Sequence, residues 1–195
     1  MSLPSPEIAE TLTAVLKQFV AGQPVVSSDL LASVYQQLRV LANHRLRADP
    51  HSTLQPTELV HEAWLHLGGG SDSSPVWENR RHFFGAAARA MQQILVTHAR
   101  RKRAAKRGNA RPLVELGSIL DLAADPLPEV ILALDEALAT FAITFPTEAE
   151  VVLLRFYAGL SVVETADALT LSVRQTERHW QFARAWLYHA LETGT

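Results

Sequence analysis

The side chains best suited to chemistry in this 195-residue sequence are basic residues gathered between positions 77 and 112. That window holds ten of the eighteen Lys and Arg residues and a single Glu, a net charge of +9, whereas the whole chain carries -2. Lys and Arg neutralise phosphates and release counterions, so such a cluster predicts a polyanion-binding element. A solvated basic face is the alternative, although acidic partners at i,i+4 are missing.

A second set of polar side chains follows a tight turn in residues 160–178, LSVVETADALTLSVRQTER. Small Ala166 lets two helices approach, Leu169 and Leu171 fill the angle between them, and Ser172 can cap the second helix. That helix is expected to bury Thr176, Trp180, Ala183 and Leu187. Near its N-terminus, where a recognition helix meets base edges, it is expected to present Arg174, Gln175, Arg178 and His179. An ordinary αα-hairpin is the alternative.

The basic block also contains residues that can stack on or hydrogen-bond to exposed bases: Trp77, Phe83, Phe84, Gln92 and Gln93. Each aromatic side chain is better suited to a core position. The cluster Arg100, Arg101, Lys102 and Arg103 has no such alternative.

Several other kinds of chemistry are excluded. The chain has no cysteine, and therefore no disulfide, thiolate zinc site or cysteine nucleophile, which suits a reducing compartment. His61 and His66 lie i,i+5, about 140° apart on a helix, whereas a zinc-protease helix needs i,i+4. There is no Gly-rich phosphate loop, G-x-S-x-G elbow or carboxylate pair, and the scattered acids of residues 113–167 are expected to be solvated. We expect no catalysis, no metal and no cofactor.

The elements that must position these side chains all appear helical from their periodicity, and no run alternates with period two. With 48% hydrophobic residues, the chain has enough apolar side chains to form hydrophobic cores. Helices are predicted at about 8–20, 28–47, 57–67, from 81 into the basic tail at 100–108, 129–141, 147–157, 162–169 and 172–191. The fold class is therefore all-α, with an N-terminal extension (1–27), a helical domain (28–107), a linker (108–128) and a second helical domain (129–195) that ends in a helix-turn-helix.

The start of the chain, MSLPSPEIAE, has neither a basic nor an apolar signal region. No apolar run approaches the ~20 residues of a membrane helix. We expect a cytoplasmic protein with no membrane segment.

Together, these motifs resemble a bacterial extracytoplasmic-function (ECF) sigma factor. The similarity rests on LVHEAWL (59–65), NRRHFFGAAARAM (79–91), the basic helix, the linker and the terminal helix-turn-helix, and covers about residues 28–192. It implies one domain that binds RNA polymerase and opens the −10 element, and another that reads the −35 element.

The resemblance also implies roles for individual positions. Polymerase contacts are expected in the helix at 57–67, at Leu59, Val60, Glu62, Ala63 and His66. Contacts to the −10 element are expected at Arg89, Gln93, Arg100, Arg101, Lys102 and Arg103. Contacts to the −35 element are expected at Arg174, Gln175, Arg178 and His179. The sequence departs from the family at Thr170, Gln175 and Glu177, where Gly, Thr and a basic residue are common, so the promoter sequence does not follow.

The start of the 57–67 helix differs from the family in a way that suggests regulation. An acidic cluster of the Asp-Ala-Glu-Asp type is usual there, and this chain has Gln55, Pro56, Thr57 and Glu58. A phosphate on Thr57 would add about −1.5 to −2 charges at a helix N-terminus, where the macrodipole favours anions. ECF groups without the acidic cluster include ones activated by threonine phosphorylation. We therefore predict phosphorylation at Thr57 or Thr53, with helix capping as the alternative role of either residue.

The expected partners are bacterial core RNA polymerase, promoter DNA, and a Ser/Thr protein kinase or an anti-sigma factor. A stand-alone helix-turn-helix regulator is the main alternative, but it gives the basic block and the Thr57 helix no role. A helical adaptor that binds only proteins is another, and it predicts no salt-dependent DNA affinity.

Overall fold

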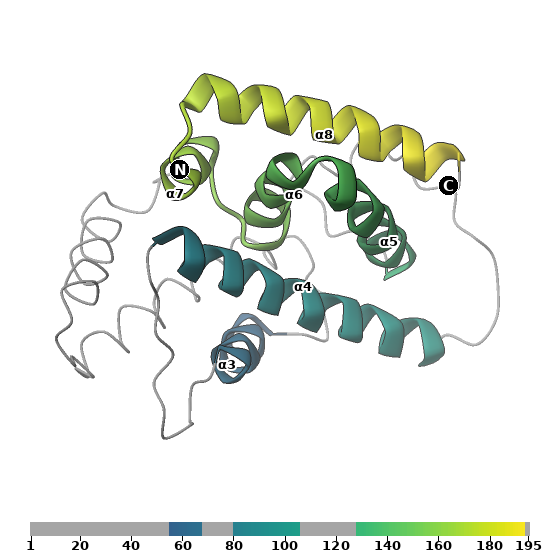
Figure 1. Ribbon diagram of the computed structural model, residues 1–195. Coiled ribbons are helices and arrows are strands. Elements are labelled where there is room, and N and C mark those ends of the chain that lie inside the picture. Colours follow the sequence, from purple (N-terminus) through teal and green to yellow (C-terminus); the bar gives the residue numbers. More distant parts are fainter. Residues whose placement is uncertain (1–54, 68–79, 106–127, 194–195) are drawn as a thin grey trace, which may run out of the picture.

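The computed structural model describes residues 55–67, 80–105 and 128–193 (Figure 1). All elements in these ranges are helices, which confirms the predicted all-α class. They are α3 (Pro56–His66), α4 (Arg80–Ala105), α5 (Pro128–Thr144), α6 (Pro146–Val152), the π-helical turn η2 (Leu153–Tyr157), α7 (Val162–Leu169) and α8 (Val173–Thr193). The helices predicted at 8–20 and 28–47, and nearly all of the predicted linker, lie outside the described residues.

The helices α7 and α8 begin with matching caps. The backbone N–H of Glu164 donates to Ser161 Oγ at 3.2 Å, and the N–H of Ser161 donates to Glu164 Oε2 at 2.8 Å. At α8, the N–H of Gln175 donates to Ser172 Oγ at 3.2 Å, and the N–H of Ser172 donates to Gln175 Oε1 at 2.9 Å. Both pairs satisfy backbone groups that a helix start leaves open, so the predicted cap at Ser172 is confirmed.

The turn between α7 and α8 contains a residue in the left-handed region. Thr170 has φ 58° and ψ 40°, a conformation that costs a residue with a Cβ about 1–2 kcal/mol. The turn is closed by Leu171, whose N–H donates to the Ala166 carbonyl at 2.9 Å. Thr170 is also the position at which the family that the sequence resembles commonly has Gly, so this departure changes the strain of the backbone.

The predicted helix at 147–157 is interrupted by η2, a wider turn. Its i,i+5 hydrogen bond joins the N–H of Ala158 to the Leu153 carbonyl at 3.2 Å. The last four residues of η2, Leu154 to Tyr157, are all buried. Among them, Arg155 is only 8% exposed, and its guanidinium carbon lies 4.8 Å from the ring centre of Trp180. The π turn therefore brings α8 into contact with a residue that an α-helix would point elsewhere.

The helix α4 lies in the middle of the packing, with α3 on one side and α5, η2 and α7 on the other (Figure 1). One cluster of buried residues joins these elements, and it includes Leu59, Met91, Leu134 and Leu187. A smaller cluster joins Val96 and Ala99 of α4 to Ile131 of α5. No helix in the described part of the chain is both long and apolar enough to cross a bilayer.

Candidate nucleic-acid interface

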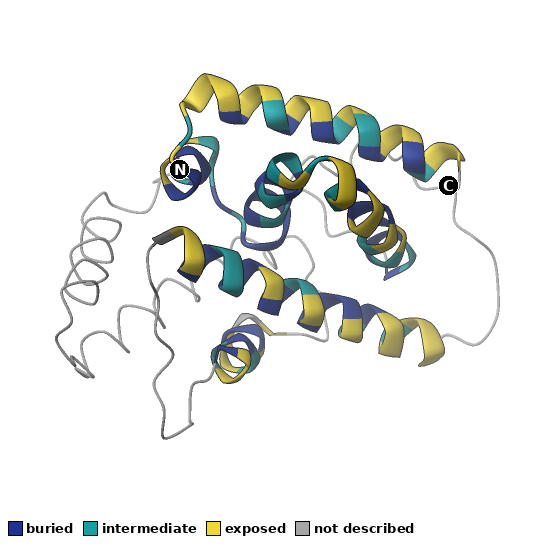
Figure 2. Cartoon of the chain, viewed as in Figure 1, coloured by how far each residue is buried: buried dark blue, intermediate teal, exposed yellow. Residues whose placement is uncertain are grey.

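The helix α8 has a buried stripe on one side and an exposed polar face on the other. Its outer side is exposed, and the side toward α5 to α7 is buried (Figure 2). The buried positions include all four that the sequence predicted: Thr176, Trp180, Ala183 and Leu187. The first turns expose Arg174, Gln175 and Arg178. This part of α8 therefore offers two guanidinium groups and an amide to a ligand.

The expected exposure of His179 is wrong. Its side chain is 29% exposed, and Nδ1 lies 3.0 Å from Glu148 Oε1 on α6. His179 therefore faces the protein and ties α8 to α6. The side chain of Gln175 is exposed, but its carbonyl oxygen is engaged in the cap, so only the amide NH₂ is left to bind a ligand.

The basic residues of α4 lie largely in solvent. Arg89, Gln93, Arg100, Arg101 and Arg103 are exposed, and Lys102 is half-buried. Three of them, Arg89, Gln93 and Arg100, fall within about 40° of one another around the helix axis. They form one polar stripe, which runs along α4 toward its C-terminal end.

The aromatic residues that precede this stripe belong to the core. Phe83 and Phe84 are 0% and 2% exposed, and their rings meet edge to face at 5.2 Å. They are therefore not available as stacking platforms in this conformation, and Trp77 lies outside the described residues. The amide of Gln92 is also engaged, since Nε2 donates to Asp135 Oδ1 of α5 at 2.8 Å.

The predicted polymerase contacts on α3 fall on both faces of the helix. Leu59, Val60 and Ala63 are completely buried against the neighbouring helices, Glu62 is half-buried, and His66 is exposed. The exposed face instead includes Leu65, which is 52% exposed and was not predicted. A sequence signal did exist, because Leu65 lies outside the helical stripe formed by the other apolar residues of α3.

The start of α3 places Thr57 on the surface. The N-cap residue is Gln55 and Pro56 occupies the first turn, so Thr57 follows the cap instead of providing it. The capping alternative for Thr57 is therefore wrong, and Thr53 lies outside the described residues. The N–H of Gln55 donates to Glu58 Oε2 at 3.4 Å.

The acids of α3 lie close to α4, as His98 shows. Burial, chiefly, and then Lys102 lower the pKa of His98 below 6.5, while Glu58 and Glu62 oppose this shift. We therefore expect a charge change at the start of α3 to act on His98 of the basic helix.

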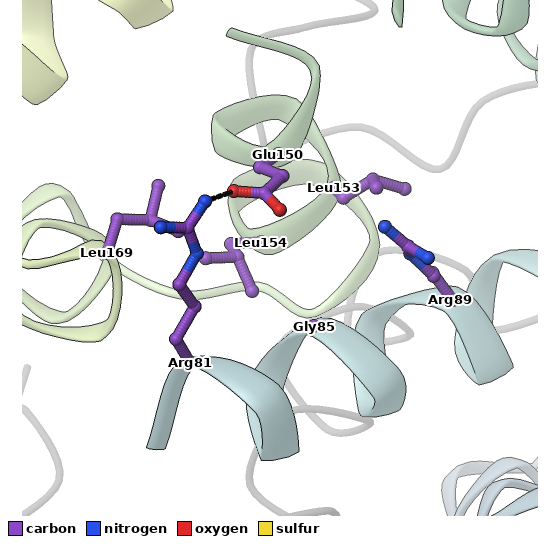
Figure 3. A pocket seen from close by; sticks show the side chains of 7 residues that line it. All are labelled: Arg81, Gly85, Arg89, Glu150, Leu153, Leu154 and Leu169. Atoms are coloured by element: carbon purple, nitrogen blue, oxygen red, sulfur yellow. Dashed lines mark hydrogen bonds and ion pairs between the residues drawn. The ribbon is translucent and has the colours of Figure 1, made fainter. Parts of the chain in front are cut away.

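The face of α4 toward α6 carries a small pocket that the sequence did not predict. It is lined by Arg81, Gly85, Arg89, Glu150, Leu153, Leu154 and Leu169 (Figure 3). Arg81 Nη2 lies 2.5 Å from Glu150 Oε2.

The expectation that the acids of 113–167 are solvated is therefore wrong for Glu150, as it is for Asp135 and Glu148, each of which has a partner on another helix. In the described ranges, no group of three or more His, Asp or Glu side chains is placed to hold a metal.

Comparison with known proteins identifies the family. A family profile described as ECF sigma factor matches residues 9–193, which include the basic helix α4 and the α7–α8 turn. No curated protein and no solved structure matches the chain. The chain therefore belongs to the ECF sigma factor family, whose members bind core RNA polymerase and promoter DNA to direct transcription initiation.

Proposed function

We propose that α8 reads the −35 element, that α4 contacts the −10 element, and that α3 contributes to polymerase binding. The observation that carries this proposal is the α8 face on which Arg174 and Arg178 are exposed directly after the turn, opposite a buried stripe. Arginine side chains at the start of a helix that follows such a turn suit the major groove, where guanidinium groups bind guanine edges. Gln175 adds its amide NH₂ group, and His179 is assigned a positioning role through Glu148.

On α4, the exposed arginines suit phosphate contacts. The stripe of Arg89, Gln93 and Arg100 is continuous with Arg101, Lys102 and Arg103, and charges of one sign along one helix suit a polyanion. In this proposal, residues 28–107 and 129–195 act as two domains on the two promoter elements. The proposed site of action is the cytoplasm.

On α3, we assign polymerase binding to the exposed face, with His66 and Leu65 in contact. Leu59, Val60 and Ala63 support that face from the core. This assignment keeps the predicted helix as the binding element and changes which of its side chains meet the partner.

We further propose that phosphorylation of Thr57 activates polymerase binding. Thr57 is exposed at the start of α3, where the first backbone N–H groups of a helix and its macrodipole favour an added anion. Glu58 is the one acid in the first turn, so the family's acidic cluster is incomplete there. A kinase can supply the missing charge.

The test compares binding of four proteins to bacterial core RNA polymerase by anisotropy at fixed salt. These are the wild-type chain, its kinase-phosphorylated form, Thr57→Glu and Thr57→Ala. We expect tight binding by the phosphorylated form, weaker binding by Thr57→Glu because Glu carries less charge, and the weakest binding by Thr57→Ala treated with kinase. Equal binding by all four would refute the switch and leave the sigma function intact. An anti-sigma factor would then be the regulator to seek.

A stand-alone regulator predicts a different result for DNA. It would bind a specific duplex without polymerase, whereas a sigma factor should gain sequence specificity only in the holoenzyme. Footprinting of promoter DNA with and without polymerase separates the two.

A further inference from the structure

We propose that Arg81, Gly85 and Arg89 form a binding site for a backbone phosphate of the promoter strand, and that the free chain fills this site with its own Glu150 carboxylate. This inference rests on the function proposed above. The stretch of α4 that contains these three residues is called the phosphate strip below.

The strip is built from positions i, i+4 and i+8 of one helix, which lie on the same face. Arg81 and Arg89 rise from α4 toward α6 on either side of Gly85 (Figure 3). A Cβ built at Gly85 would meet nothing within 4 Å, so the floor between the two guanidinium groups is open. Two arginines over an open floor suit an anion that accepts several hydrogen bonds, such as a phosphate.

Glu150 supplies an anion to this strip in the free chain. Its carboxylate is paired with Arg81, and it lies in the same pocket as Arg89. The side chains of Arg81 and Glu150 are 54% and 31% exposed. An ion pair that is open to solvent is weak, so a phosphate on a strand held nearby can replace it.

Contacts between α4 and α5 cover one edge of the polar stripe of α4, the face that would meet DNA. Val96 lies about 20° beyond Arg89 around the axis of α4, at the edge of the polar stripe, and it is buried against Ile131 of α5. The hydrogen bond from Gln92 to Asp135 joins the same two helices. DNA laid along the polar stripe would therefore meet α5 and α6.

The spacing of the two promoter elements requires the packing of α5 to α8 against α4 to open. The −10 and −35 elements are centred about 25 base pairs apart, or about 85 Å at 3.4 Å per base pair. A helix of the length of α4 spans only about 39 Å, and α4 shares one core cluster with α8. The chain cannot contact both elements in this conformation. When α5 to α8 move away, Glu150 leaves the strip and a phosphate can enter.

The first experiment measures opening in the free, full-length chain. Because the chain has no cysteine, Thr97→Cys on α4 and Ala185→Cys on α8 provide two exposed labelling sites for energy transfer. Glu150→Lys places like charges across the contact, and we expect it to lower the transfer efficiency. Its matched control is Glu136→Lys, the same charge change on an exposed side chain of α5, which should leave transfer unchanged. Circular dichroism confirms that both variants are folded.

The second experiment measures binding to a single-stranded −10 oligonucleotide. We expect Glu150→Lys to raise the affinity of the free chain about fivefold, and Glu136→Lys to change it less than about twofold. In the Glu150→Lys background, Arg81→Gln or Arg89→Gln should each reduce the slope of log affinity against log salt by about 0.7, the loss of one phosphate contact. The double variant Arg81→Glu with Glu150→Lys should return the transfer efficiency to the wild-type value and should lose the gain in DNA affinity that Glu150→Lys gives alone.

Three outcomes would overturn the inference. Unchanged transfer and DNA affinity in Glu150→Lys, in a protein that still binds polymerase and initiates transcription, would refute the site while leaving the proposed function intact. Opening without any change of salt slope in the arginine variants would refute the phosphate strip. Failure of the wild-type chain, phosphorylated or not, to bind polymerase would instead remove the proposed function, and this inference with it.

Discussion

The helices α3 and α8 were both predicted to present contacts to a partner. The predicted residues are mostly exposed on α8 and mostly buried on α3. On α8, the predicted polar set and the predicted buried stripe lie on opposite faces, apart from His179. On α3, three of the five predicted contacts are core residues. The α8 prediction combined residue type with helical spacing, whereas the α3 prediction matched positions to a family. Spacing contains information about which face is buried, and position matching alone does not.

The largest expected effect tests the core role of the α3 residues. Leu59→Ala should lower the free energy of unfolding by about 2–5 kcal/mol, because Leu59 is completely buried and the substitution leaves a cavity. The exposed Leu65→Ala is the matched control and should stay within about 0.5 kcal/mol of wild type. Denaturant unfolding measures both. A stable Leu59→Ala protein that loses polymerase binding would reverse our assignment of the two faces.

The corresponding test on α8 separates function from stability. Arg178→Ala should weaken promoter binding by the holoenzyme by about 1–3 kcal/mol, the contribution of a good contact to a base. Because Arg178 is exposed, the free energy of unfolding should change by less than about 0.5 kcal/mol. Gln181→Ala, three residues further along α8, is the control for general effects. Promoter affinity that Arg178→Ala leaves unchanged would show that the exposed face of α8 is only a solvated surface.

A smaller effect is expected at the turn that positions α8. Thr170→Gly should raise the free energy of unfolding by about 0.5–1 kcal/mol, because Gly adopts the left-handed conformation without strain but loses more entropy on folding. The same substitution inside α4, Thr97→Gly, should instead destabilise by about 0.3 kcal/mol, the difference between the helix propensities of Thr and Gly. Thermal unfolding of the two variants gives opposite signs if the backbone at Thr170 is the cause. Destabilisation in both would mean that the Thr170 side chain contributes more than its strain costs.

These differences also mark how far the sequence predicts the structure. Apart from the interruption at η2, the positions of the helices in the described residues and the buried stripe of α8 followed from local patterns, because apolar periodicity and the Ser172 cap are properties of neighbouring residues. The contacts of Arg81 with Glu150 and of Gln92 with Asp135 join helices far apart in the chain. No local pattern identifies such partners. The π turn at η2 was not predicted either. Its consecutive buried residues, Leu154 to Tyr157, follow neither the period of an α-helix nor that of a strand.

The smallest effect concerns His98, at the junction of α3 and α4. Because its pKa is lowered in the folded chain, the stability from neutral His98 is fully present above pH 6.5 and is lost as the pH falls toward the lowered pKa. The loss should be below about 1 kcal/mol, since the side chain is only half-buried and solvent screens it. His98→Gln should remove this part of the pH dependence in denaturant unfolding.

The same residue reports on α3. Phosphorylation of Thr57 should raise the pKa of His98 in an NMR titration, because it adds negative charge beside Glu58. An unchanged pKa of His98 would show that a charge added at the start of α3 does not act on α4.

The π turn at η2 has a consequence for how the chain tolerates insertions and deletions. An extra residue is accommodated there, between α6 and the α7–α8 unit, in the hydrogen bond from Ala158 to Leu153. Removing one residue from 153–157 would restore an α-helical turn and rotate everything that follows by about 100°. Arg155 would leave Trp180, and the exposed face of α8 would turn toward a different side of the molecule. The number of residues in 153–157 thus determines the direction in which the exposed face of α8 points.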